Sequence, residues 1–253
     1  MRALGDGLLW DLSPEGAGAG ADLAVLLLPG LGGGARDFAL WPRHLAPPFR
    51  VLAARYPGRD PAAPAAGAAA SRDLLGTALA ERLAHHVQEP LVVFGHSLGA
   101  AVGYETAWQL ARRRRPALAL HVSAALPPPD YASLDLGARA MDDAALAGLA
   151  RALAVPLPHE DRPGDRRAAL RTLRHDLALV DAYDYGPSPR PLDYPVTVWS
   201  ARDDAIIPAA AAGRWQAMAR HPLTHRALPV EHHHLSHPAA VTAITEALRG
   251  LLA

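Results

Sequence analysis

The sequence has 253 residues, half of them hydrophobic and a fifth charged, which is ordinary for a soluble globular protein. Its 25 basic residues, all arginine, balance 25 acidic ones, and a net charge of zero disfavours nucleic acid and anionic membranes as partners. The sequence contains no cysteine, which excludes a thiolate nucleophile and cysteine-ligated metals. It has neither a hydrophobic leader nor a run of 18 hydrophobic residues, so we expect a soluble cytoplasmic protein.

Short hydrophobic runs alternate with segments of helical periodicity along most of the chain. Uninterrupted runs of this length are typical of strands buried on both faces of a sheet. Strands are predicted at 23–28, 49–54, 91–94, 118–122, 196–199 and 225–228. Helices are predicted at 71–87, 98–115, 209–219 and 238–252. This alternation predicts a single α/β domain over residues 1–253, with a mostly parallel central sheet and helices on both faces.

One segment interrupts the alternation. Residues 127–190 begin with three prolines, continue with two short patterns of helical periodicity and end in a proline-rich stretch. A connection of this length between two strands is usually functional. We therefore predict a helical lid, inserted within the single domain. A second irregular stretch, residues 62–70, is an alanine-rich loop of low complexity.

A serine stands between two glycines at the end of the strand predicted at 91–94, in the sequence Gly95-His96-Ser97-Leu98-Gly99. With a strand before it and a helix after it, this G-x-S-x-G pattern is typical of a strained turn that presents the serine hydroxyl as a nucleophile. The helix N-terminus adds the positive end of a dipole. In the alternative interpretation, Ser97 only caps the helix.

A nucleophilic serine needs a base and an acid that orients the base. In proteins with the G-x-S-x-G turn, the acid and then the histidine follow the serine along the chain. Asp203 and Asp204 follow the strand at 196–199, and His232 follows the last strand. Asp204 lies four residues before Pro208, the register of a D-x-x-x-P pattern. We predict a Ser97–His232–Asp204 triad, with Asp203 as the alternative acid.

Three consecutive histidines, 232–234, raise the question of a metal site. Adjacent side chains project in different directions, so three in a row rarely close on one ion, and the chain lacks an H-E-x-x-H pattern. We therefore expect no metal ligand. His233, His234 and His237 are interpreted as packed or exposed side chains, and His96 as a neighbour that shapes the serine turn.

The glycine-rich loop after the first strand, Pro29-Gly30-Leu31-Gly32-Gly33-Gly34-Ala35, fits two functions. It could supply an oxyanion-hole donor, for which the N–H of Leu31 is our candidate beside the N–H of Leu98. It also matches the dinucleotide fingerprint G-x-G-x-x-G/A. That fingerprint needs an acid at the end of the second strand, where this chain has Ala53-Ala54-Arg55-Tyr56. Dinucleotide binding therefore stays as an alternative.

Together these motifs resemble type II thioesterases of polyketide and nonribosomal peptide assembly lines, within the α/β-hydrolases, over about residues 20–250. Gly30 and Leu31 replace an aromatic or His and an Ala of the first motif. Val230 and Glu231 replace two glycines of the last motif, P-G-G-H-F, in which His233 takes the place of Phe. The matching segments are Pro29–Trp41, Pro57-Gly58-Arg59, Phe94–Ala100, Glu105, Leu173-Arg174-His175-Asp176 with Tyr183, and Pro229–His233.

The resemblance implies an α/β-hydrolase fold without a cofactor. It implies hydrolysis of acyl thioesters held on the phosphopantetheine of an acyl or peptidyl carrier protein. Leucines recur at helical spacing within the predicted lid, and we expect some of them to contact the acyl chain. The candidate substrate-binding residues are Gly30, Leu149, Leu153 and Leu173. A general carboxylesterase or other acyl-releasing hydrolase, and a scaffold that keeps the triad only to bind a partner, are the remaining alternatives.

Overall fold

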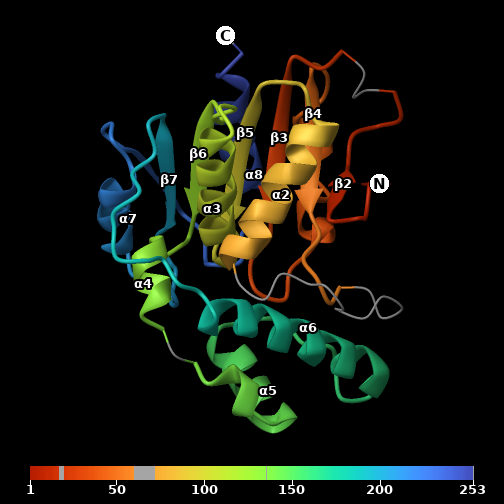
Figure 1. The fold of residues 1–253 in the computed structure, drawn as a ribbon. Coiled ribbons are helices and arrows are strands. Elements are labelled where there is room, and N and C mark those ends of the chain that lie inside the picture. Colours follow the sequence, from red (N-terminus) through yellow and green to blue (C-terminus); the bar gives the residue numbers. More distant parts are fainter. Residues whose placement is uncertain (17–19, 60–71, 135, 253) are drawn as a thin grey trace.

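The fold is built on one eight-stranded sheet, which confirms the predicted α/β class (Figure 1). The structure, a computed structural model, describes residues 1–16, 20–59, 72–134 and 136–252, so the loop predicted at 62–70 lies outside the described residues. The strand order is β1-β2-β4-β3-β5-β6-β7-β8. The strands are β1 (Arg2–Leu4), β2 (Leu9–Asp11), β3 (Leu23–Leu28), β4 (Phe49–Ala54), β5 (Leu91–His96), β6 (Ala119–Ser123), β7 (Val196–Ala201) and β8 (Thr224–Leu228).

Strands β3 to β8 are parallel to one another and correspond to the six predicted strands. Strands β1 and β2 were not predicted; they pair antiparallel with each other, and β2 pairs also with β4. Every residue of β3 and β5 is buried, as their hydrophobic runs predict. Because parallel strands all end at the same edge, the loops after β3, β5, β7 and β8 meet there.

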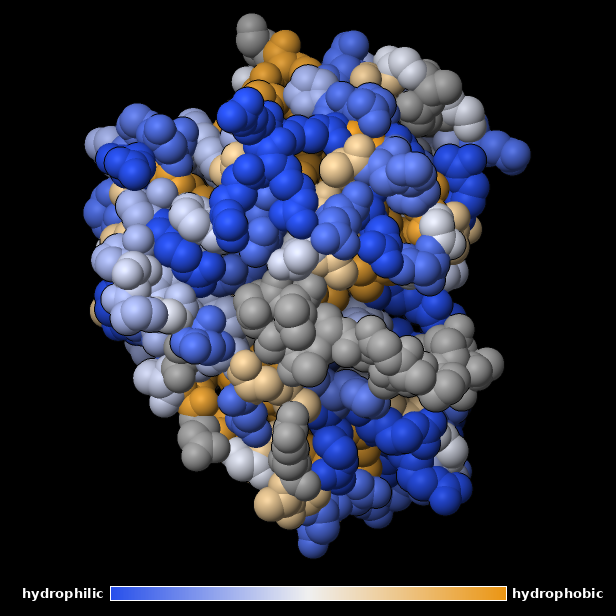
Figure 2. Space-filling view, viewed as in Figure 1, coloured by the Kyte–Doolittle hydropathy of each residue, from blue (hydrophilic) through white to orange (hydrophobic). Residues whose placement is uncertain are grey.

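Helices cover both faces of the sheet (Figure 1). On one face lie α2 (Arg72–His86) and α3 (Leu98–Arg112), which pack against each other. On the other face lie α8 (Pro238–Arg249) and the short α1 (Trp41–His44). Two hydrophobic clusters fill the layers between the sheet and these helices. On the outer surface of the first face, hydrophilic residues dominate and hydrophobic ones form small separate patches (Figure 2).

The helix predicted at 209–219 differs from the structure, which has two short elements there. A four-residue helix α7 (Ala211–Arg214) tightens into the 3-10 turn η3 (Trp215–Met218). The Trp215 side chain is fully buried, and its indole N–H donates to the Ala125 carbonyl at 3.0 Å. Burial of this large side chain explains why the backbone departs from a regular helix, since tertiary packing overrides local propensity.

The chain between β6 and β7 forms a separate helical layer. It contains α4 (Pro128–Ala132), η2 (Ala138–Ala140), α5 (Asp143–Ala152) and α6 (Pro163–Asp181). Figure 1 shows α5 and α6 side by side beyond one end of the sheet. These two helices enclose a hydrophobic cluster of their own, which includes Leu146, Leu170 and Leu177. The hydrophobic faces of these two amphipathic helices are therefore largely buried against each other.

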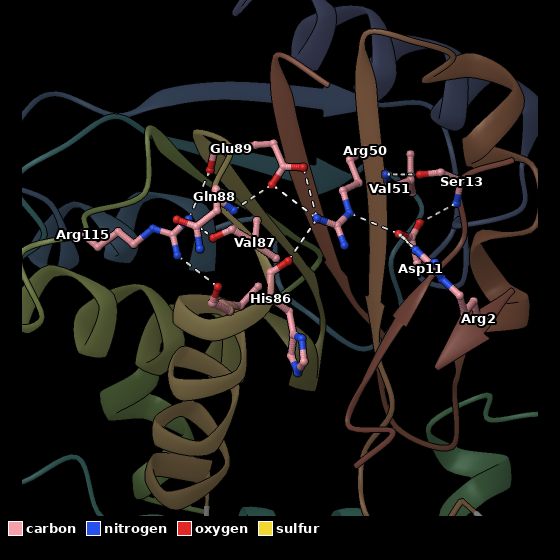
Figure 3. Close-up of polar contacts among 11 residues, drawn as sticks. Arg2, Asp11, Ser13, Arg50, Val51, His86, Val87, Gln88, Glu89 and Arg115 are labelled. Carbon is pink, nitrogen blue, oxygen red and sulfur yellow. Dashed lines mark hydrogen bonds and ion pairs between the residues drawn. The ribbon is translucent and has the colours of Figure 1, made fainter. Parts of the chain in front are cut away.

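Ion pairs join the elements at the opposite, amino-terminal end of the parallel strands (Figure 3). The Arg50 guanidinium at the start of β4 bonds Asp11 of β2 and Glu89 before β5, each at 3.1 Å. It also donates to the carbonyl of His86, the last residue of α2. Arg115, which follows α3, donates to the Leu83 carbonyl at 3.0 Å. These ion pairs and hydrogen bonds hold the end of α2 in place beside the sheet.

No helix in the described ranges is both long and hydrophobic enough to span a membrane.

Candidate active site

Ser97 occupies a strained turn between β5 and α3. Its backbone angles, φ 52° and ψ −123°, lie in a region that residues with a side chain rarely adopt. Glycines make the turn possible, because a Cβ on Gly95 would lie 2.2 Å from the Gly99 carbonyl oxygen. A Cβ on Gly99 would lie equally close to the Leu28 carbonyl oxygen of β3. The G-x-S-x-G spacing therefore results from close backbone packing, and strain at Ser97 marks a functional position.

A chain of hydrogen bonds joins Ser97, His232 and Asp204. The His232 Nε2 atom lies 3.2 Å from Ser97 Oγ, and His232 Nδ1 lies 2.8 Å from Asp204 Oδ2. Ser97 follows β5, Asp204 follows β7 and His232 follows β8, so the three loops meet at the carboxyl edge of the sheet. All three side chains are nearly buried, which strengthens the electrostatic interactions among them.

Asp204 is held in place by its own backbone neighbours. Its Oδ1 atom accepts hydrogen bonds from the N–H groups of Ile206 and Ile207, both at 2.8 Å. Burial alone would raise the pKa of Asp204, but the hydrogen bonds from His232 and from these two N–H groups bring that pKa below its ordinary value. The alternative acid, Asp203, is exposed, and its N–H donates to the Val230 carbonyl. The hydrogen bond to His232 thus favours Asp204 over Asp203 as the acid that orients the histidine.

The loop after β3 presents its backbone toward the serine turn. The N–H groups of Gly32, Gly33 and Gly34 donate to Asp176, Gly30 and Asp37. Within the part of the chain that the structure describes, the Leu31 N–H has no acceptor. Leu98 is the first residue of α3, where an N–H has no acceptor inside the helix. Both predicted oxyanion donors are thus available at the edge that carries Ser97.

A pocket of about 200 Å³ lies beside the serine turn. Gly30 lines it, and a Cβ on this residue would be 3.3 Å from the Ser97 Cβ. The walls combine the hydrophobic Leu31 and Val155 with polar side chains, among them Asp37 and His233. Its lining residues are Gly30–Gly33, Asp37, His96, Val155, Pro156, His233, Leu235 and Ser236.

The predicted lid leucines lie elsewhere. Leu173 is fully buried in the cluster between α5 and α6, and Leu149 and Leu153 pack against the same cluster. None of the three lines the pocket beside Ser97. From this segment, Val155 and Pro156 reach the pocket instead. Sequence periodicity missed them because they follow the end of α5, outside the helical pattern.

Four histidines, 96 and 232–234, cluster next to the nucleophile, although only His232 was predicted to have a catalytic role. His234 is buried, and its ring nitrogens lie 2.8 Å from Ser123 Oγ and 2.9 Å from the Glu231 carbonyl oxygen. His233 is exposed, with Nε2 3.0 Å from the Leu153 carbonyl oxygen. Burial, together with the neighbouring histidines, holds the pKa of His96 well below its ordinary value. His96 is therefore a neutral imidazole at neutral pH.

The mostly parallel sheet, with a strained serine at the turn from β5 into α3, defines an α/β-hydrolase fold. RedJ, a thioesterase from the prodiginine pathway of Streptomyces coelicolor, superposes with a TM-score of 0.76 at 28% identity, over 91% of this chain and 85% of that one. The type II thioesterase BorB from the borrelidin cluster gives a TM-score of 0.78 at 26% identity, over 98% of this chain and 100% of that one.

Sequence comparison leads to the same group. A "probable cadicidin biosynthesis thioesterase" of Streptomyces griseus is 30% identical over 231 residues, which are 88% of this chain and 62% of that protein. This chain thus spans less than two thirds of the length of that relative. The family model of the thioesterase domain matches residues 24–252. The protein belongs to the thioesterase domain family.

Proposed function

We propose that this protein hydrolyses acyl thioesters held on the phosphopantetheine arm of an acyl or peptidyl carrier protein, in polyketide or nonribosomal peptide biosynthesis. The observation that carries the proposal is the hydrogen-bonded chain from Ser97 through His232 to Asp204, at a strained turn. The similarity to thioesterases of natural-product pathways supports the substrate class. The proposal includes a cytoplasmic location, where carrier-bound intermediates are made.

In the first half of the reaction, Ser97 Oγ attacks the thioester carbonyl carbon while His232 Nε2 takes the hydroxyl proton. Asp204, hydrogen-bonded to Nδ1, keeps the imidazole in the productive tautomer and stabilises its protonated form. The N–H groups of Leu31 and Leu98 hold the oxyanion, and each such donor contributes about 3 kcal/mol to transition-state stabilisation.

Breakdown of the tetrahedral intermediate breaks the C–S bond. The pantetheine sulfur leaves as a thiolate and takes the proton from His232, which leaves an acyl ester on Ser97. A water molecule then attacks this ester while His232 accepts a proton from it, and the proton returns to Ser97 as the free acid departs. Each step uses residues of this chain alone, without a cofactor.

The segment between β6 and β7 acts in this proposal as a lid inserted in one domain. Its α6 helix bonds the loop that carries Leu31, since Asp176 accepts the Gly32 N–H at 2.8 Å. Its Leu153 carbonyl contacts His233, next to the proposed base. The pocket lined by Gly30, Val155 and Pro156 receives the acyl group or the pantetheine arm.

Dinucleotide binding is disfavoured by the short elements after the glycine-rich loop. The dinucleotide fingerprint needs a long helix whose N-terminus faces the pyrophosphate. Here the loop leads into the 3-10 turn η1 (Ala35–Phe38) and the four-residue α1. Neither element has the length to supply that dipole.

The test compares acyl groups on a carrier protein, on free pantetheine and on simple oxygen esters. We expect the carrier-bound thioester to react with the highest kcat/KM and Ser97→Ala to lose on the order of 10⁴-fold or more in rate. A preference for simple esters would instead identify a general carboxylesterase. Full activity in Ser97→Ala, with unchanged folding by circular dichroism, would refute the mechanism.

A further inference from the structure

Histidines from two strand ends converge beside Ser97. His96 comes from the end of β5, whereas His232 and His233 come from the loop after β8. The His232 ring centroid lies 5.1 Å from that of His96 and 4.8 Å from that of His233. One imidazole nitrogen from each of the three side chains lies within 4.8 Å of the other two. The triple histidine of the sequence thus gains a partner from a distant strand.

His96 is the side chain that the mechanism leaves without a role. It is 2% exposed, and neither of its ring nitrogens has a hydrogen-bond partner among the described residues. Leaving a buried polar group unpaired costs about 1–3 kcal/mol, so such a group needs an explanation, and a bound ion is one. His96 also lines the pocket, together with His233.

The other two histidines have the surroundings that metal-binding imidazoles usually have. A ligating histidine normally donates its second ring N–H to a carboxylate or a backbone carbonyl, which fixes the ring orientation. His232 Nδ1 is 2.8 Å from Asp204, and His233 Nε2 is 3.0 Å from the Leu153 carbonyl oxygen. The opposite nitrogen of His233 has no hydrogen-bond partner among the described residues, and that of His232, Nε2, contacts the Ser97 hydroxyl, which could itself be a ligand. His234 is not among the three residues whose nitrogens lie within 4.8 Å of one another, and its ring nitrogens bond Ser123 Oγ and the Glu231 carbonyl.

We propose that His96, His232 and His233 form a binding site for a divalent transition-metal ion such as Zn²⁺, and that the bound ion inhibits the enzyme. Tetrahedral Zn²⁺ with bonds of about 2.0–2.1 Å brings its ligand atoms to about 3.3 Å from one another. The present nitrogen spacing, at most 4.8 Å, is up to about 1.5 Å wider, so two rings that approach each other by that distance in total reach it. Ser97 Oγ, 3.2 Å from His232 Nε2, or a water molecule completes the coordination.

Inhibition is expected because the metal ion would occupy the lone pair of His232 Nε2. His232 Nε2 must accept the Ser97 proton, and a nitrogen bound to Zn²⁺ has no lone pair left for it. The inhibitory part of the inference rests on the proposed function, whereas metal binding does not. The expectation of no metal site, reached from the sequence, considered the three adjacent histidines and the lack of an H-E-x-x-H pattern, but not a ligand from another strand. The third ligand here comes from β5.

Binding is tested by titrating the EDTA-treated full chain with ZnCl₂ in a calorimeter, and with Co²⁺ while following its ligand-field absorption. We expect one ion per chain and a tetrahedral Co²⁺ spectrum. His233→Phe and His96→Asn should each weaken binding at least tenfold, since losing even a hydrogen-bond partner of a ligand costs about 10–100-fold. Ser97→Ala should still bind, because the nitrogens hold the ion. Binding unaffected by both histidine variants would overturn the site.

A matched control removes another pair of neighbouring histidines. His85 and His86 lie in the last turn of α2, with ring centroids 4.7 Å apart. The double variant His85→Gln/His86→Gln should bind Zn²⁺ as the unmodified protein does. Loss of binding in this variant would assign the ion to the surface pair and overturn the proposal.

Inhibition is measured separately. Zn²⁺ should slow both thioester turnover and fluorophosphonate labelling of Ser97, EDTA should reverse the effect, and His233→Phe should need at least tenfold more Zn²⁺. Stoichiometric binding without slower labelling would overturn the inhibitory role. A protein that binds Zn²⁺ as expected but hydrolyses no thioester would count against the proposed function and leave the metal site standing.

Discussion

Arg59 and Asp176 form a buried, bidentate ion pair that links α6 to the glycine-rich loop after β3. The two guanidinium nitrogens lie 2.6 and 2.8 Å from the carboxylate oxygens, and the Asp176 side chain is fully buried. Arg59 Nε also donates to the Gly33 carbonyl, and Asp176 accepts the Gly32 N–H. The pair therefore fixes the loop whose Leu31 N–H is proposed to bind the oxyanion.

Asp176→Asn should lower kcat by about 10- to 100-fold, because a displaced catalytic group is costly even when the movement is near 1 Å. Removing one partner of a buried pair should also reduce the free energy of unfolding by about 3 kcal/mol or more. Steady-state kinetics and urea unfolding measure the two effects. The control is Asp143→Asn, which breaks only the exposed pair with Arg174 in the same segment. Equal kinetics in both variants would contradict the positioning role.

The two adjacent acids should differ sharply. Asp204→Asn removes the charge that stabilises the His232 imidazolium and permits the wrong tautomer, so we expect kcat to fall by about 10⁴-fold. Asp203→Asn changes an exposed side chain and should stay within about twofold. Measurement of kcat with one acyl thioester decides between them. The opposite ranking would move the orienting acid to Asp203.

Gly30→Ala tests how closely the loop approaches the nucleophile. The added Cβ would lie 3.3 Å from the Ser97 Cβ and 3.2 Å from the His96 Cδ2. We expect kcat/KM to fall by at least about tenfold, since the loop must retreat from the reacting carbonyl. Gly34→Ala is the matched control, because no atom of the described residues lies within 4 Å of a Cβ there. Similar kinetic parameters in the two variants would argue against this geometry.

A buried histidine of β6 should make stability depend on pH. Burial, with a smaller effect of Arg226, lowers the pKa of His121 from 6.5 to about 4. Between those values the unfolded chain binds a proton that the folded chain does not. The free energy of unfolding is therefore highest above pH 6.5. It decreases as the pH falls toward 4, by about 3 kcal/mol in all.

The variant that isolates this effect is His121→Gln, which cannot ionise but can still accept the hydrogen bond that Trp199 Nε1 donates to His121 Nδ1. Urea unfolding at pH 7 and pH 5 should show a decrease about 2 kcal/mol smaller in the variant than in the unmodified protein. His225→Gln, at an exposed position of β8, is the control. Parallel losses in all three proteins would refute the assignment.

Much of this architecture could be predicted from local sequence. The strands β3 to β8 are hydrophobic runs, and the loops that carry Ser97, Asp204 and His232 each follow a strand. Because parallel strands end at one edge, the order of these residues along the chain was enough to predict that they meet. The pair β1–β2 was missed, because three-residue strands have too little periodicity to stand out.

Contacts between distant segments could not be predicted in the same way. Arg59 and Asp176 are 117 residues apart in the sequence. Nothing in the two sequence motifs that contain them indicates that these side chains form an ion pair. His96, at the end of β5, and His233, in the loop after β8, approach each other because both strands end at the same edge of the sheet. Val155 and Pro156 reach the pocket from an irregular turn, whereas the periodic leucines fill the segment's own core.

The most direct test of the central claim is to trap the covalent intermediate. An acyl thioester of pantetheine is mixed with stoichiometric protein, quenched in acid at successive times, digested and analysed by mass spectrometry. The mechanism predicts that the acyl mass appears transiently on Ser97 and decays as free acid forms, and that Ser97→Ala acquires no acyl group. Turnover with no acyl group on Ser97 at any time, or with the acyl group on another residue, would contradict it.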